Sequence, residues 1–174
     1  MRSTLTQYRP KSIESLPSSV SVLTEDVFYF IKIYTHDNKA LFGEFANDHF
    51  QLNGFGQIAA DEWVRSSRPY GSIELDEWLV LPDRLEGIVS IRAASSAKRY
   101  GTPRSKPRLL SSFVASYKAA AAKRINLIRN APGSSVWQRS YQERCIPDDL
   151  VLGRARQLLL KQLPTNPMHR VSEN

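Results

Sequence analysis

The chain has few of the residues on which common catalytic sites depend. Cysteine occurs once, at Cys145, which excludes an intrachain disulfide and any multi-thiolate zinc site. The three histidines, His36, His49 and His169, share no metal-ligand spacing. The sequence contains no recognisable glycine-rich phosphate loop and no Ser/His/Asp set. The familiar zinc, nucleotide-hydrolysis and serine-hydrolase sites are therefore not predicted.

Long apolar runs are also missing. A helix that spans a bilayer needs about 20 predominantly apolar residues, and no stretch of this sequence approaches that length. Residues 1–21 are polar and lack the apolar core of a secretion signal. No basic helix with a bulky aromatic face indicates binding to a membrane surface. We therefore expect a cytoplasmic protein that has no membrane partner.

A further absence is local, because no carboxylate occurs between Glu86 and Glu143. Eleven of the 24 Lys and Arg residues lie in this stretch, so the net charge of +7 arises there. A block of one sign attracts polyanions, and binding releases counterions from a phosphate backbone. We expect these unopposed cations to converge on one groove that binds nucleic acid. The alternative interpretations are a merely solvated basic surface and contact with acidic lipid.

The apolar patterns predict an α+β fold. Residues 1–25 carry little patterned apolar content and are expected to form a flexible N-terminal arm, followed by one domain over 26–174. Helices and strands in the order β–β–β–α–β–β–α–β–α indicate an antiparallel sheet covered by helices. The predicted strands are 27–34, 41–45, 49–52, 72–81, 87–91 and 136–146, and the predicted helices are 55–66, 108–129 and one that starts at 147–149.

Charged residues stand out at two places in this scheme. On the long helix, Lys123 lies opposite the apolar stripe, whereas Arg124 falls inside it and must either snorkel or meet a partner. In the turn after strand 72–81, Asp83 and Glu86 could hold a hard divalent cation. Because Arg84 stands between these two carboxylates, a solvated turn is the favoured interpretation.

Several separated motifs resemble the REP-associated tyrosine transposases, a branch of the single-tyrosine HUH nuclease superfamily. The motifs are ELDEWLVLP, VWQRSYQERCI and the ending NPMHRVSEN, and the similarity runs in register from about Val27 to Asn174. The matching positions include Leu75, Trp78 and Trp137. The resemblance implies a ferredoxin-like antiparallel sheet with packed helices, as in HUH transposases.

In that family, two histidines separated by one apolar residue hold Mg²⁺ or Mn²⁺ against the scissile phosphate. A tyrosine on the late helix then attacks single-stranded DNA. Here the two histidine positions match Arg84 and Glu86, and a third family histidine matches Arg144. The tyrosine position falls on Gln162.

Counting from the start of the last helix instead places the nucleophile near Arg156 and Gln157. Neither alignment supplies a tyrosine, because Tyr141 is the last one in the chain. A glutamine amide cannot act as the nucleophile, and Arg84 would repel a cation. The resemblance with these departures predicts a transposase-like DNA-binding protein that is catalytically inactive or repurposed and needs no cofactor.

The expected partner is single-stranded or hairpin DNA, bound by a monomer or a dimer. Cations of the long helix and of the preceding loop would contact phosphates, and Trp137 or Tyr141 could stack on an unpaired base. For Trp137, core packing is the favoured alternative. The predicted DNA-binding residues are Lys98, Arg99, Arg104, Lys106, Lys118, Lys123, Arg124, Arg129, Arg139 and Trp137.

Two other functions stay open at this point. An enzyme with an altered site would use Asp83 and Glu86 to hold Mg²⁺ or Mn²⁺ and Tyr141 as the nucleophile. A protein-binding scaffold would show no affinity for nucleic acid, even at low salt.

Overall fold

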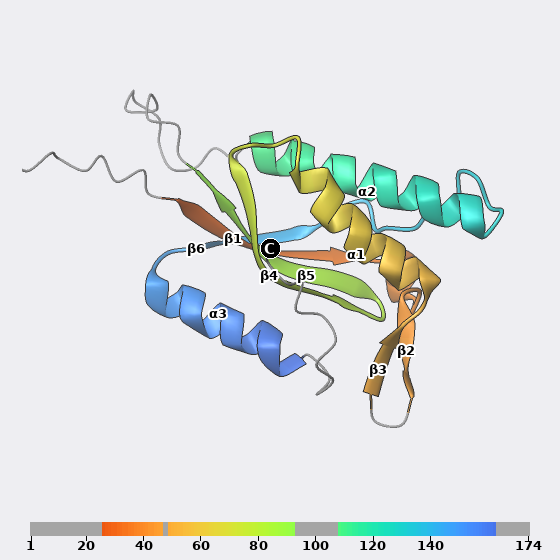
Figure 1. Cartoon of the computed structure of the whole chain (residues 1–174), viewed down its shortest axis with the longest axis horizontal. Coiled ribbons are helices and arrows are strands. Elements are labelled where there is room, and N and C mark those ends of the chain that lie inside the picture. Colours follow the sequence, from red (N-terminus) through yellow and green to blue (C-terminus); the bar gives the residue numbers. More distant parts are fainter. Residues whose placement is uncertain (1–25, 47–48, 93–107, 163–174) are drawn as a thin grey trace, which may run out of the picture.

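A four-stranded antiparallel sheet lies at the centre of the computed structural model, which describes residues 26–46, 49–92 and 108–162 (Figure 1). Its strands follow the order β4 (Ile73–Leu81), β5 (Arg84–Ile91), β1 (Val27–Tyr34) and β6 (Gln142–Ile146). Strands β2 (Gly43–Ala46) and β3 (His49–Leu52) form a separate hairpin.

Helices cover both faces of the sheet. Helices α1 (Gly54–Ser67) and α2 (Arg108–Ile128) lie on one face, and α3 (Asp149–Gln162) lies on the other (Figure 1). The predicted α+β class and the predicted order of strands and helices are confirmed. A short 3-10 turn, η1 (His36–Asn38), follows β1 and was not predicted. Among the described residues, no helix is long and apolar enough to cross a membrane.

Local sequence explains where two of the helices begin. The Asn53 side chain accepts hydrogen bonds from the backbone N–H groups of Phe55 and Gly56 and so caps α1. At the start of α3, the Asp148 carboxylate accepts a hydrogen bond from the N–H of Val151. Along α2, apolar residues at steps of three and four are buried, which gives the helix one face for the core.

The two faces of the sheet enclose cores of different size. The larger core, under α1 and α2, is rich in aromatic side chains, with the Trp63 ring 4.9 Å from Phe113 and 5.0 Å from Tyr117. The smaller core, under α3, is built mainly from aliphatic side chains such as Ile88 and Leu159. Successive residues of β5 point to opposite faces, so this strand contributes to both cores.

Two predicted boundaries are wrong. Strand β5 begins at Arg84, three residues before the predicted start, because the chain pairs with β1 as soon as it leaves the turn. Glu86 is therefore a buried strand residue and not part of a solvated turn. At the other end of the sheet, β6 begins only at Gln142, and Trp137 makes an isolated bridge with Thr35. The predicted arm, residues 1–25, lies outside the described residues.

Candidate functional site at the turn between the central strands

Arg84 and Glu86 lie two residues apart on β5 and share the face of the sheet that α3 covers. Glu86 is only 1% exposed, and one oxygen of its carboxylate, Oε1, is contacted by two cations. The Arg84 Nε donates to Glu86 Oε1 at 2.7 Å, and Lys32 Nζ on the neighbouring strand β1 lies 3.0 Å from the same oxygen. A buried carboxylate between two cations stays ionised.

These contacts set the pKa values of the cluster. Burial alone would raise the pKa of Glu86, but hydrogen bonds from Arg84 and Lys32 and their positive charges outweigh burial and lower that pKa. Burial likewise opposes the charged form of Arg84, yet the two neighbouring carboxylates raise its pKa. Each partner therefore fixes the other in its charged state, and Glu86 is not a candidate for proton transfer near neutral pH.

Gln162, at the end of α3, reaches the same cluster. Its Nε2 donates to Glu86 Oε2 at 3.3 Å. The fold therefore brings together the three positions at which the resemblance places the histidine pair and the nucleophile, although Gln162 follows Glu86 by 76 residues in the chain. Arg156, which the other alignment indicated, instead forms a bidentate pair with Asp76 of β4, at 2.9 Å and 2.5 Å.

The residues present do not fit a divalent cation. Arg84 Nη1 donates to Asp83 Oδ1 at 2.7 Å while its Nε contacts Glu86, so a guanidinium lies between the two carboxylates that would have to hold the metal. A second positive charge at this place would meet strong repulsion. Within the described ranges, no group of three or more His, Cys, Asp or Glu side chains could hold a metal ion.

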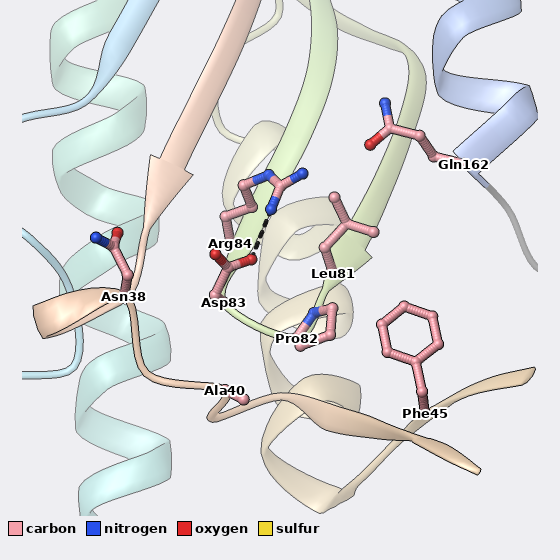
Figure 2. Close-up of a pocket in the computed structure, with 8 residues that line it drawn as sticks. All are labelled: Asn38, Ala40, Phe45, Leu81, Pro82, Asp83, Arg84 and Gln162. Carbon is pink, nitrogen blue, oxygen red and sulfur yellow. Dashed lines mark hydrogen bonds and ion pairs between the residues drawn. The ribbon is translucent and has the colours of Figure 1, made fainter.

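A pocket of about 460 Å³ opens beside this cluster (Figure 2). It lies between the turn that joins β4 to β5, the segment after β1, the β2–β3 hairpin and the end of α3. Part of its wall is apolar and part carries amide, carboxylate and guanidinium groups. The lining residues are Asn38, Ala40, Phe45, Leu81, Pro82, Asp83, Arg84 and Gln162.

Tyr141 lies on the opposite face of the sheet. It packs against the larger core under α1 and α2, and its hydroxyl donates to Glu143 Oε2 at 2.6 Å. Burial and this hydrogen bond raise the pKa of Tyr141 to about 12. A phosphate held near Glu86 would therefore be separated from Tyr141 by the sheet, so the alternative site with these two residues is not assembled. Arg144 is exposed on β6, where it pairs in register with Phe30.

Trp137 and Lys118, both predicted to bind DNA, form an internal contact. Trp137 is buried in the larger core, as the favoured alternative predicted, and its Nε1 donates to the backbone oxygen of Lys118 at 3.1 Å. The Lys118 amine donates to the backbone oxygens of Gln138 and Arg139, at 2.6 Å and 3.0 Å. Burial lowers the pKa of Lys118. These hydrogen bonds connect α2 to the segment before β6.

The expectation that the cations of the acid-free stretch are unopposed is wrong for two of them. Arg124, inside the apolar stripe, meets a partner, because its Nη1 lies 2.6 Å from Glu62 Oε1 on α1 and its Nη2 lies 3.9 Å from Asp61. Arg92 pairs with Glu74 of β4. In both cases an acid from the first part of the chain is brought to the cation by the fold.

The remaining cations that were predicted to bind DNA differ in exposure and in whether protein groups occupy their donors. Arg129 donates to Asn126 Oδ1 at 2.8 Å and to the backbone oxygen of Ser135 at 3.4 Å. Lys123 is exposed on α2, and Arg139 is exposed on the segment before β6. The predicted loop residues Lys98, Arg99, Arg104 and Lys106 lie outside the described residues.

Two residues of this region were not predicted from the sequence. Lys32 is the only charged residue in the strand VFYFIKIY. A lysine within an otherwise apolar strand indicates a carboxylate partner on a neighbouring strand. Nothing in the sequence around Phe45 indicates that its ring lines a pocket rather than the core. A short hairpin does not reveal which of its sides faces the protein.

Comparison with known proteins supports the fold. A protein of Haemophilus influenzae, itself uncharacterized, is 27% identical over 135 residues, covering 70% of this chain and 72% of that protein. A solved structure of a REP-associated tyrosine transposase bound to a REP hairpin matches with a TM-score of 0.50 and 14% sequence identity. That match covers 86% of this chain and 67% of the other. No protein-family model matches. The chain thus has a transposase-like fold.

Proposed function

We propose that this protein binds single-stranded or hairpin DNA through its transposase-like fold and does not cleave it. The fold is similar to that of a REP-associated tyrosine transposase bound to a REP hairpin, which makes hairpin DNA the first ligand to test. The sequence also retains a net charge of +7, with an acid-free stretch between Glu86 and Glu143. Such a charge distribution favours a polyanionic partner.

The observation that carries the proposal of inactivity is the contact among Arg84, Glu86 and Gln162. These residues occupy the three positions that the resemblance assigns to metal binding and nucleophilic attack, and Glu86 accepts a hydrogen bond from each of the other two. A guanidinium, an ion-paired carboxylate and an amide supply neither an open metal site nor a nucleophile. Removal of both functions abolishes essentially the whole rate enhancement, because the groups act as one unit.

The cations that we propose to contact phosphates are the exposed ones. Lys123 on α2 and Arg139 before β6 are exposed to solvent. Arg129, the residue after the end of α2, is partly buried and already donates to Asn126 and Ser135, so it is less suitable. Arg124 and Lys118 are less suitable, because protein groups already occupy their donors. Replacement of one phosphate-contacting lysine lowers the slope of log affinity against log salt by about one.

The test is a combined binding and cleavage assay. A labelled DNA hairpin with a single-stranded flank is titrated with the protein in Mn²⁺ and, separately, in EDTA. We expect equal binding in both, an affinity that falls with salt, and no covalent protein–DNA adduct. Lys123→Ala should flatten the salt dependence, while Leu150→Ala, an exposed apolar residue of α3, serves as the control and should leave it unchanged.

The assay also separates the other functions. A covalent adduct that requires Mn²⁺ would show a working strand-cleaving enzyme and contradict the proposal. Absence of binding at low salt would favour a protein-binding scaffold.

A further inference from the structure

Phe45 is an exposed aromatic side chain at the pocket beside Arg84. Its residue is 71% exposed, and it is the only aromatic among the exposed large apolar residues of the described chain. Single exposed aliphatic residues are common on protein surfaces, but an exposed aromatic ring that lines a pocket with several polar groups is typical of a ligand site.

The ring of Phe45 is supported from behind. Phe45 of β2 lies directly opposite Phe50 of β3 in the hairpin register, and the two ring centroids are 5.5 Å apart at an angle of 51°. Cross-strand aromatic pairs of this kind stabilise each other. The hairpin is itself attached to the body, because the N–H of Phe42, directly before β2, donates to the backbone oxygen of Pro82 in the turn between β4 and β5 at 3.0 Å. Phe45 is therefore held as a platform.

Across the pocket from this platform, one donor and one acceptor are available. Arg84 uses Nε for Glu86 and Nη1 for Asp83, and no partner of its Nη2 is found among the described residues. Figure 2 shows this second terminal nitrogen directed away from Asp83. Gln162 uses its Nε2 for Glu86 and for the backbone oxygen of Leu158, which leaves its Oε1 as an acceptor within the part of the chain described.

The charge of the cluster selects the kind of ligand. Asp83 and Glu86 balance Lys32 and Arg84, since all four are linked by ion pairs. A neutral cluster offers a phosphate little net attraction. An uncharged planar group with donors and acceptors along its edge fits better, because it can stack on the ring and hydrogen-bond on the other side. A nucleobase has these properties.

We propose that this pocket binds one unpaired nucleobase of the DNA, which stacks on Phe45 and hydrogen-bonds with Arg84 and Gln162. This inference rests on the proposed function and specifies where the DNA is held and by which chemistry. A pocket of about 460 Å³ falls within the range of roughly 300–1,000 Å³ found for small-ligand sites. Binding of the base requires no metal, because the guanidinium of Arg84 supplies the donor.

The experiment uses the full chain and a set of DNA hairpins that carry 2-aminopurine at one position of the single-stranded flank. Stacking on an aromatic ring quenches the fluorescence of this base. We expect strong quenching at one flank position, in EDTA as well as in Mn²⁺. Phe45→Ala should abolish the quenching and weaken binding roughly tenfold to a hundredfold, the usual contribution of one base–aromatic stack. Phe45→Tyr should retain both.

Leu150→Ala is the matched control, since it removes an exposed apolar side chain at the far end of α3 from Gln162. Circular dichroism spectra of all variants exclude misfolding as the cause of a loss. If the wild-type protein binds the hairpins without quenching at any position, or if Phe45→Ala behaves like the control, the base-binding pocket is refuted while the proposed function stands. If the wild-type protein binds no hairpin at low salt, both are refuted.

Discussion

The two faces of the central sheet differ in chemistry, and β5 shows this within one strand. Leu85 and Val89 point into the aromatic core under α1 and α2. Arg84 and Glu86 point to the side of α3 and meet Lys32 and Gln162 there. One face is filled almost completely by apolar side chains, whereas the other combines a small apolar core with a cluster of charges at one end.

Residues that agree with the transposase motifs and residues that differ from them also lie on different faces of the sheet. Leu75, Trp78 and Trp137 belong to the large core or pack against it. The departures Arg84, Glu86 and Gln162 lie together on the α3 side. The comparison shows that one face holds the larger core, and that the other holds an internal network of ion pairs at the positions where the resemblance implies a metal site and a nucleophile.

The largest effect is expected on the face that holds the larger core, from Trp63→Ala. Trp63 is fully buried between Phe113 and Tyr117, and truncation of a buried aromatic residue costs about 3–5 kcal/mol. Urea denaturation should therefore show a stability loss of this size, or a variant that does not fold. The control, Leu150→Ala on exposed α3 surface, should stay within about 0.5 kcal/mol of the wild type. Equal losses of stability in Trp63→Ala and Leu150→Ala would contradict the assignment of Trp63 to the larger core.

A smaller but still large effect is expected on the site face, from Glu86→Ala. Removal of the carboxylate leaves Arg84 and Lys32 without their shared partner, and breaking a buried ion pair costs about 3 kcal/mol or more. Because Lys32 and Arg84 are partly exposed, water compensates some of this loss, and we expect about 2–3 kcal/mol in urea denaturation at pH 7.

The pH dependence of the stability of Glu86→Ala tests whether ion pairs stabilise the site face. The pKa of Glu86 is lowered in the folded protein, although burial alone would raise it, because Arg84 and Lys32 outweigh burial. A carboxylate with a depressed folded pKa stabilises the protein above its unfolded pKa, and this contribution is lost as the pH falls through the folded value. The stability difference between wild type and Glu86→Ala should therefore be complete at neutral pH and shrink once the pH falls below the ordinary pKa of a glutamate. A difference that grows on acidification would contradict the ion-pair interpretation.

The sequence predicted the order of strands and helices, but not the contacts among the charged residues of the candidate site. Strand and helix order followed from apolar periodicity, because burial on one face imposes a repeat of two or of 3.6 residues. Periodicity does not tell which charged residue of a strand meets which partner, so Glu86 was placed in a solvated turn. Its burial depends on Lys32 of β1, a neighbour 54 positions earlier in the chain. The convergence of Gln162 with Glu86 followed only from the resemblance.

The charge block illustrates the same limit. A count along the chain made Arg92 and Arg124 part of an unopposed cationic segment, but Glu74 and Glu62 pair with them in the fold. Charge density in sequence measures local excess, whereas the field that a ligand meets depends on distances in space. Antiparallel strands and packed helices place residues from distant segments side by side, which no linear count records.

The smallest effect is expected from Tyr141→Phe, which tests the boundary between the two faces. The Tyr141 hydroxyl donates to Glu143 at 2.6 Å, so its removal should cost about 0.5–1.5 kcal/mol in urea denaturation, the usual net contribution of one hydrogen bond. Binding of hairpin DNA should not change, because the substitution keeps the ring that packs against the larger core and removes no positive charge. The pKa of about 12 also keeps the phenol protonated at neutral pH, so the hydroxyl is poorly prepared to attack a phosphodiester. Binding and covalent-adduct assays on the wild type and this variant check the point. An adduct present in the wild type and absent from Tyr141→Phe would place the chemistry on the side of the larger core, away from Arg84, Glu86 and Gln162.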